Sequence, residues 1–170
     1  IHERLVGSEM CIRDRKVVTL PLEMADKNPK NIFVEGPVSP VKIGEDIAHH
    51  QKKTNIGAHS IFMGQVRADS VDGAAVLAIE YTAHQEMALL AMHEIREAIF
   101  AKYPLTCLHI THSLGLVKAG EICLFVFASA VHRKEAIAAC EEVVERIKKE
   151  LPIWGKELSL IHISEPTRRS

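Results

Sequence analysis

The chain has 170 residues, a length typical of a single domain. Its 21 lysines and arginines are balanced by 22 aspartates and glutamates, so the formal net charge is −1. This balance argues against binding to nucleic acid or to an anionic membrane surface, and the longest apolar stretch, residues 122–131, is about half as long as a bilayer span. Because the four cysteines form no CxxC pair, we expect free thiols and a cytoplasmic location.

The two ends of the chain are related at the level of coding DNA. Residues 5–15 can be encoded by a DNA whose reverse complement reads, in one frame, as residues 158–168. This DNA also resembles a transposase adapter used to build sequencing libraries. We therefore expect residues 1–15 and 158–170 to be adapter-derived.

Between these ends we expect two parts. Residues 16–30 are predicted to be a leader or a disordered N-terminus, with Met24 as the natural start. Residues 31–157 are predicted to form the domain, because neither a linker nor a repeat divides them. A native tail is expected to be missing after Glu157.

In the first half of the domain, hydrophobic periodicity and turn residues predict strands and helices in alternation. A short strand is expected at residues 31–35 and a short helix at 43–52. Alternating small and apolar residues predict a long strand at 57–67. After a turn or loop at 68–73, its partner strand is expected at 75–81.

The second half contains the two long helices. Apolar residues recur every four positions from 84 to 102 and predict an amphipathic helix. A strand is expected at residues 105–113, followed by turns at Gly115 and at 118–120 and by a second strand at 121–130. The second long helix is expected at 133–151, and residues 152–154 end it. This order predicts an α+β sandwich, a largely antiparallel sheet with helices on one face.

Histidine and cysteine occur in patterns that do not favour a metal site. His49 and His50 are adjacent on a predicted helix and so point about 100° apart. On the strand at 105–113, alternation places Cys107 and His109 on one face and His112 on the other. We expect packing or surface histidines here and no bound metal ion.

Common catalytic signatures are absent from the sequence. It contains no GxSxG, Walker A or GxGxxG motif, which argues against the usual serine hydrolases and nucleotide-binding enzymes. Cys123 and Cys140 fall on predicted core positions, where a free cysteine is usually an inert apolar residue. The candidates for chemistry are therefore cations.

These cations lie at the predicted ends of strands and helices. Residues 122–127 are apolar on both faces, which predicts that the strand at 121–130 is central in the sheet. Arg67 ends a long strand, and His132 and Arg133 lie where this central strand meets the second long helix. Lys148 lies in the last turns of that helix and Lys156 just after it. Strand ends and helix N-termini are frequent places for anion sites, and arginine suits phosphate. We therefore consider an anion-binding site, with ordinary solvated charges as the alternative.

The sequence resembles the large, catalytic subunit of molybdopterin synthase over residues 31–157. Several independent stretches match in the same order, which is more specific than any single motif. They are residues 57–67 (GAHSIFMGQVR), 78–81 (AIEY), 112–115 (HSLG), 119–121 (AGE), 128–133 (ASAVHR) and 147–154 (IKKELPIW).

The resemblance implies an α/β-hammerhead fold and a homodimeric core. It also implies a small ubiquitin-like sulfur-carrier subunit on each end, which makes a heterotetramer. The carrier's C-terminal thiocarboxylate supplies two sulfurs to cyclic pyranopterin monophosphate and so forms the dithiolene of molybdopterin. The carrier's tail enters a pocket of the large subunit. The resemblance implies no metal and no redox cofactor.

The resemblance also implies site residues. They are Lys148 and Lys156 for catalysis, and Gln65, Val66, Arg67, His132, Arg133, Gly155 and Glu157 for substrate binding. One departure stands out, because many members have a lysine where this chain has Gly155. Either Lys156 replaces that lysine through a small backbone shift, or the second lysine is dispensable.

Two other functions remain open at this stage. The chain could be a dimeric docking module for the carrier without turnover, which Gly155 and the missing tail favour. It could also be an unrelated α+β sensor domain that binds a small phosphorylated ligand.

Overall fold

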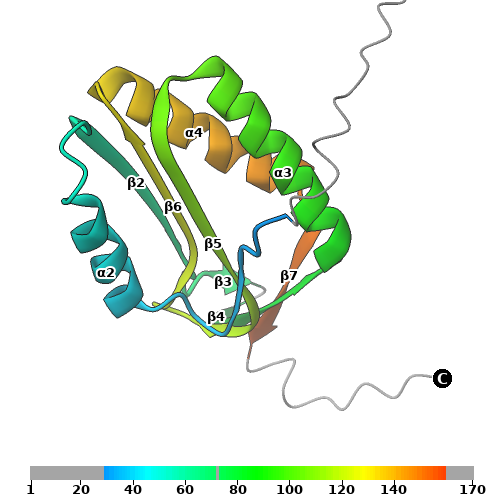
Figure 1. Ribbon diagram of the computed structural model, residues 1–170. Helices are drawn as coiled ribbons and strands as arrows, with labels where there is room; N and C mark the ends of the chain where they lie inside the picture. Colours follow the sequence, from blue (N-terminus) through cyan, green and yellow to red (C-terminus); the bar gives the residue numbers. More distant parts are fainter. Residues whose placement is uncertain (1–28, 72, 160–170) are drawn as a thin grey trace, which may run out of the picture.

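The computed structural model describes residues 29–71 and 73–159, and in this part of the chain it contains seven strands and three helices (Figure 1). The expectations for residues 1–28 and 160–170 lie outside the described residues. The elements are β1 (Phe33–Glu35), α2 (Pro40–His50), β2 (Ala58–Gln65), β3 (Ser70–Val71), β4 (Ala74–Ala83), α3 (Gln85–Lys102), β5 (Leu105–Lys118), β6 (Ile122–Ala130), α4 (Arg133–Glu150) and β7 (Ile153–Ser159).

The strands form one sheet in the order β2-β6-β5-β4-β3, with β1 paired to β5 and β7 paired to β4. Every pairing is antiparallel except that of β1 with β5. Strand β5 pairs with β6 through its first half and with β4 through its second half. The change of partner occurs beside Gly115, whose φ of 74° is accessible to glycine without strain. The prediction of a turn at Gly115 is therefore wrong, because this residue lies inside the continuous strand β5.

The core lies on both faces of the central strand β6. Leu124, Val126 and Ala128 point to one face, where they pack among buried residues of α3 and α4. Phe125 and Phe127 point to the opposite face, where they pack with Ile43 of α2. A strand buried on both faces explains the continuous apolar run in its sequence.

The helices divide between these two faces. The long helices α3 and α4 lie side by side on one face, and the short helix α2 lies apart from them (Figure 1). The α+β class and the largely antiparallel sheet are confirmed, with the two long helices on one face. The short helix covers the opposite face.

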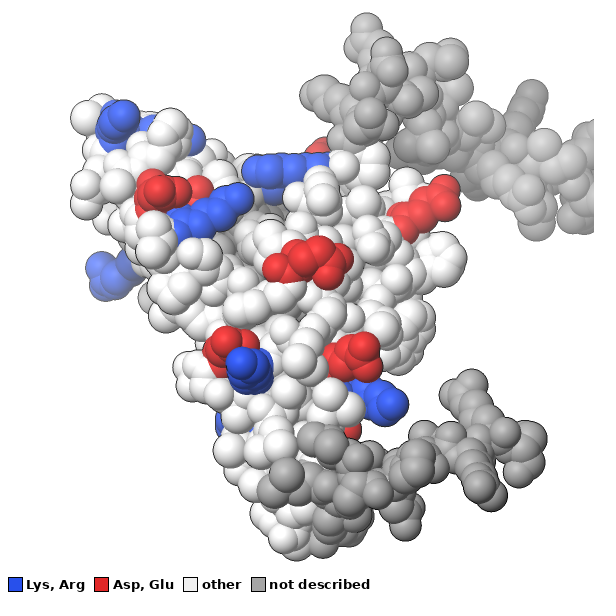
Figure 2. All heavy atoms as spheres, turned by 90° about the horizontal axis from the view of Figure 1, so that it is seen from below, with Lys and Arg blue, Asp and Glu red and all other residues white. Residues whose placement is uncertain are grey.

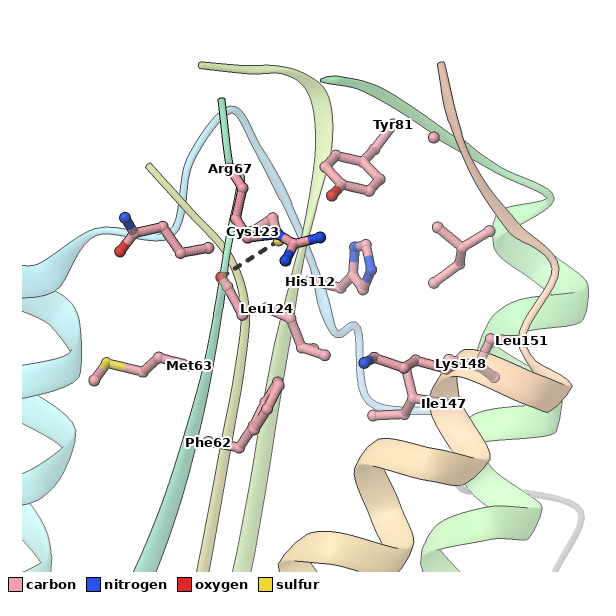
Figure 3. Close-up of a pocket in the computed structure, with 14 residues that line it drawn as sticks. Phe62, Met63, Arg67, Tyr81, His112, Cys123, Leu124, Ile147, Lys148 and Leu151 are labelled. Carbon is pink, nitrogen blue, oxygen red and sulfur yellow. Dashed lines mark hydrogen bonds between the residues drawn. The ribbon is translucent and has the colours of Figure 1, made fainter. Parts of the chain in front are cut away.

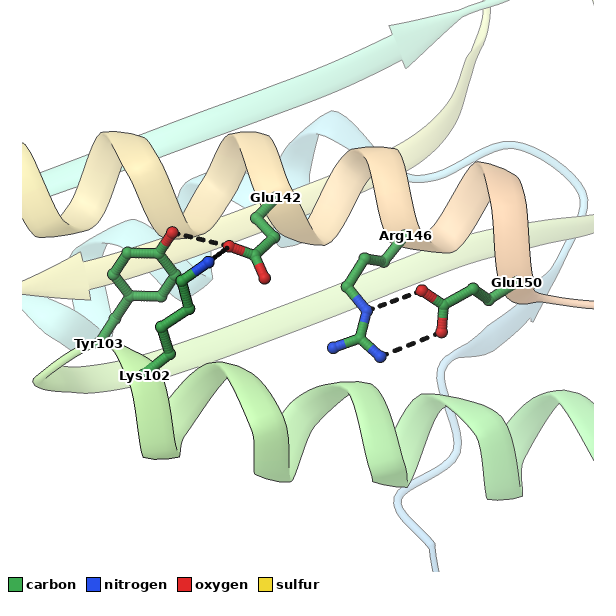
Figure 4. A network of polar contacts seen from close by, with 5 residues as sticks. All are labelled: Lys102, Tyr103, Glu142, Arg146 and Glu150. Atoms are coloured by element: carbon green, nitrogen blue, oxygen red, sulfur yellow. Dashed lines mark hydrogen bonds and ion pairs between the residues drawn. The ribbon is translucent and has the colours of Figure 1, made fainter.

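Polar contacts on the surface connect α3 to α4 (Figure 4). Glu142 accepts hydrogen bonds from Lys102 Nζ at 2.6 Å and from Tyr103 Oη at 2.7 Å, which hold the pKa of Glu142 below its usual value. Arg146 forms a bidentate pair with Glu150 one turn along α4. These groups are all partly exposed to solvent, so helix packing depends mainly on the apolar core.

Strand β7 was not predicted. Residues 152–154 were expected only to end the second long helix, yet a strand begins at Ile153 and pairs with β4 up to Ser159. Most of its residues are exposed, so its sequence lacks the alternation of apolar and polar residues that marks a half-buried strand. It also runs two residues past the domain boundary expected at residue 157.

The surface is mixed in charge. On the face seen in Figure 2, basic and acidic side chains are interspersed among wide uncharged areas. Such a face does not favour binding of a polyanion. No helix in the described part of the chain is long and apolar enough to cross a membrane.

Two glycines offer a test of the packing at the start of β2. A Cβ at Gly57 would overlap the backbone carbonyl oxygen of Val131, whereas a Cβ at Gly44, inside α2, meets nothing within 4 Å. We expect Gly57→Ala to lower the free energy of unfolding by about 1–3 kcal/mol. The control Gly44→Ala should raise it by about 0.5–1 kcal/mol, since alanine favours a helix interior. Urea unfolding measures both, and equal effects of the two substitutions would contradict the packing described here.

Candidate functional site

A cavity of about 530 Å³ opens where the end of β2, the bend of β5 and the C-terminal end of α4 meet (Figure 3). Its walls are apolar near α4 and carry polar groups near the sheet. The lining residues are Phe62, Met63, Gly64, Gln65, Arg67, Tyr81, His112, Cys123, Leu124, Ile147, Lys148, Leu151, Ile153 and Gly155. A volume of this size is typical of a site for a small molecule.

Lys148 brings a positive charge to this cavity from α4. The residue follows the buried Ile147 at the edge of the helix's apolar face, and its side chain extends toward the sheet (Figure 3). Its Nζ lies 5.8 Å from the centre of the Phe62 ring, within the range of a cation–π contact. None of the ion pairs among the described residues involves Lys148. The ammonium group is therefore available to an anionic ligand.

Arg67 supplies a second cation at the rim. It follows the end of β2 and pairs with Asp69 at 2.8 Å, while 80% of its side chain is exposed. An exposed ion pair of this kind contributes little to stability. A phosphate can therefore compete with Asp69 for the guanidinium, which binds phosphate with two parallel hydrogen bonds.

The wall of the cavity beside β5 is polar and uncharged. His112 is buried, and its Nδ1 donates to the carbonyl of Ser113 at 2.8 Å. Burial lowers the pKa of His112, so the ring is neutral at neutral pH. Tyr81 contacts the ring edge-on at 5.3 Å between centroids, and burial together with the neighbouring Cys123 raises the pKa of its hydroxyl. These side chains are not among the site residues predicted from the sequence, although Tyr81 and His112 lie inside stretches that match the resembled family.

Four of the predicted site residues line the cavity, and five do not. Gln65, Arg67, Lys148 and Gly155 are among the lining residues. Val66 is buried with 2% exposure and belongs to the core. The remaining four, which do not line it, are His132, Arg133, Lys156 and Glu157.

His132 and Arg133 are separated from the cavity by the length of α4. His132 caps the N-terminus of this helix, whereas Lys148 lies in its last turns. Arg133 and Lys148 are fifteen positions apart in α4, which corresponds to about 22 Å along the helix axis. A single chain therefore does not bring these predicted residues together, and their contribution to substrate binding stays a prediction.

The register of β7 explains the positions of Gly155 and Lys156. Gly155 lies opposite Tyr81, and a Cβ there would come within 2.9 Å of Ile79 Cγ2 and 3.3 Å of Tyr81 Cε1. Lys156 lies opposite Glu80 and, by strand alternation, points to the other face. Moving Lys156 into the cavity requires a shift of one residue in register, which inverts every side chain of the strand. This geometry argues against replacement through a small backbone shift.

The fold and the cavity define an α+β protein whose cavity carries two cationic side chains, Arg67 and Lys148. Residues 38–150 match the family model described as "MoaE protein". The match includes most of the chain, and the chain belongs to this family. The resemblance to molybdopterin synthase is thereby confirmed at the level of the family.

Individual relatives agree with this assignment. The chain is 39% identical over 109 residues to the "Molybdopterin synthase catalytic subunit" of Oryza sativa subsp. indica, a match that includes 64% of this chain and 56% of the relative. The chain thus spans just over half the length of that relative.

Solved structures give the same fold. A molybdopterin synthase structure from Staphylococcus aureus superposes with a TM-score of 0.65 at 30% identity and covers 75% of this chain and 89% of its own. A chain from a complex of subunits 1 and 2 of molybdopterin-converting factor from Helicobacter pylori has a TM-score of 0.65 at 20% identity. This match covers 75% of the present chain and 84% of the Helicobacter chain. The second likeness supports the fold alone.

The neutral state of His112 predicts a pH dependence of stability. Because burial lowers the folded-state pKa of His112 below that of the unfolded chain, the unfolded state binds more protons as the pH falls below about 6.5. The contribution of the neutral His112 to the free energy of unfolding is therefore complete above this pH and is lost progressively below it. We expect the free energy of unfolding in urea to decrease from pH 7.5 to pH 5.5, and His112→Gln to reduce that decrease. An identical decrease in the variant would contradict the assignment.

Proposed function

We propose that this chain is the catalytic subunit of a molybdopterin synthase. It transfers two sulfurs from the C-terminal thiocarboxylate of a small ubiquitin-like carrier to cyclic pyranopterin monophosphate, and so forms the molybdopterin dithiolene. The observation that carries the proposal is the Lys148 ammonium, which has no ion-pair partner among the described residues, in a cavity with Arg67 at its rim, in a chain of the MoaE family. Both a phosphorylated substrate and a thiocarboxylate are anions, and this site offers them two cations.

The residues of the cavity have separate tasks in this reaction. Arg67 binds the substrate phosphate at the open rim, where its guanidinium is exposed. The apolar wall formed by Phe62, Ile147 and Leu151 excludes water from the pterin and orients it. Lys148 brings the second cation from α4, with its ammonium over the ring face of Phe62.

Lys148 acts where negative charge develops. The carrier's thiocarboxylate sulfur first attacks a side-chain carbon of the pterin and displaces an oxygen substituent, so that a carbon–oxygen bond breaks as the carbon–sulfur bond forms. The carrier is then linked to the substrate as a thioester. Water then attacks the thioester carbonyl, the carbon–sulfur bond to the carrier breaks, and the carrier leaves as a carboxylate. The Lys148 ammonium stabilises the oxyanion formed during this attack or delivers a proton to the departing group.

The functional assembly is a homodimer with one carrier bound at each end, a heterotetramer. Strand β2 is the edge of the sheet, and its Ile61 and Met63 are exposed, as expected of a surface that another chain covers. In such a dimer, His132 and Arg133 of one protomer serve the cavity of the other, since they lie far from their own. We place the assembly in the cytoplasm.

Reconstitution tests this function. The full chain is mixed with thiocarboxylated carrier and cyclic pyranopterin monophosphate, and molybdopterin formation is measured. Product confirms a synthase. Co-elution of carrier and chain without product would indicate a docking module, and binding of the phosphorylated ligand without any carrier complex would indicate a sensor domain.

Lys148 and its neighbour provide a matched pair of substitutions. Lys148→Ala should lower the rate of sulfur transfer by about 100-fold or more, because it removes charge stabilisation at the reacting carbonyl. Lys149→Ala removes an exposed lysine from the same helical turn and should leave the rate nearly unchanged. Single-turnover kinetics compare the two variants. Similar rates for Lys148→Ala and the unmodified chain would show that Lys148 takes no part in the chemical step.

Arg67 should act mainly in binding. We expect Arg67→Ala to raise the KM for cyclic pyranopterin monophosphate with little change in kcat, because the phosphate contact is made in both the ground state and the transition state. Steady-state kinetics at saturating carrier measure both constants. A lowered kcat at constant KM would instead place Arg67 in the chemical step.

A further inference from the structure

A second cluster of reactive side chains lies outside the cavity, against the short helix. His50, the last residue of α2, meets Cys107 and His109 of β5. One donor atom from each of these three residues lies within 4.8 Å of the others. Strand alternation separates this cluster from His112, which lines the cavity.

His50 is oriented as a metal-binding histidine is. Its Nδ1 lies 2.6 Å from the carbonyl oxygen of Asp46, and this contact requires Nδ1 to carry the proton and donate it. Nε2 then carries a lone pair. The ring is 1% exposed, and Nε2 is buried without a hydrogen-bond partner among the described residues. A buried acceptor without a partner lowers stability, so this lone pair is suited to a ligand. A backbone carbonyl bonded to the far nitrogen is the usual outer contact of a metal-bound imidazole.

Cys107 and His109 complete the donor set. Cys107 is a buried free thiol, and the His109 ring stands perpendicular to that of His50 with 4.6 Å between centroids. The Lys53 ammonium donates a hydrogen bond to Cys107 Sγ at 2.8 Å. A metal ion would compete with Lys53 for the same sulfur lone pairs.

We propose that His50, Cys107 and His109 form a binding site for one transition-metal ion of the zinc class. One sulfur and two imidazole nitrogens suit Zn²⁺ or Co²⁺, whereas Mg²⁺ and Ca²⁺ prefer oxygen ligands. Three protein ligands leave one position of a tetrahedron for water or another small ligand. The site is independent of the proposed sulfur transfer, because it lies on the other face of the sheet.

The pattern of histidine and cysteine in the sequence predicted no metal here, and the tertiary structure supplies the reason to revise that prediction. Alternation along β5 predicted that Cys107 and His109 share a face, which the structure confirms. The third donor comes from a helix more than fifty residues earlier in the chain. Two donors on one strand are a weak chelate, and only the packing of α2 on the sheet adds His50.

Cobalt is a suitable probe, because a thiolate bound to Co²⁺ produces a charge-transfer band that reports sulfur ligation. The full chain is first treated with a chelator and then titrated with Co²⁺. We expect the band to saturate at one equivalent and to disappear when Zn²⁺ is added. Cys107→Ser should abolish it, whereas Cys140→Ser, which changes another buried cysteine, should retain it. Absence of the band, or its persistence in Cys107→Ser, would overturn the proposal.

Histidine substitutions test the two nitrogen ligands. His50→Gln and His109→Ala should each weaken Co²⁺ binding at least tenfold, while His49→Ala, at the exposed neighbouring position, should not. His109 is only half buried, so its variant provides the test if His50→Gln does not fold. Lys53→Met should tighten binding about tenfold by removing the competing hydrogen bond. Equal affinities for the His109→Ala and His49→Ala variants would overturn the proposal.

Discussion

The burial of strand β6 on both faces is the constraint on which the rest of the structure depends. A strand with apolar side chains on both sides needs cover on both sides, and the chain provides it with α3 and α4 on one face and α2 on the other. This arrangement fixes where each helix ends relative to the sheet. The C-terminal end of α4 then meets the end of β2, and the C-terminal end of α2 meets the first half of β5.

Two sites of different chemistry result from this layering. On one side, Lys148 and Arg67 offer positive charge beside the neutral His112 and Tyr81, a combination suited to a small anion. On the other side, His50, Cys107 and His109 offer soft donors without a carboxylate among them, a combination suited to a transition metal. Strand β5 contributes to both, because alternate residues of one strand point to opposite faces.

The proposed reaction depends on a charge that has no ion-pair partner among the described residues. Near the helix ends, Lys102 and Arg146 have carboxylate partners in Glu142 and Glu150. Lys148 instead contacts the face of an aromatic ring. The departure at Gly155 fits this arrangement, since Tyr81 and Ile79 occupy the space that a side chain at this position would need. The site therefore has one cation from α4 and one from the end of β2, and none from β7.

The class of the fold, most of its elements and the family follow from the amino-acid sequence alone. Amphipathic periodicity predicted both long helices, and the apolar run at residues 122–127 predicted a central strand, because these patterns record local burial. It did not predict β7, whose residues are mostly exposed and so carry no alternation. It also could not separate Lys148 from Lys156 or from Arg133. Which of these residues lie close together depends on strand register and on the length of α4, and both are properties of the tertiary structure. The same holds for His50 and Cys107, which lie far apart in the chain and are brought together by the packing of α2 against the sheet.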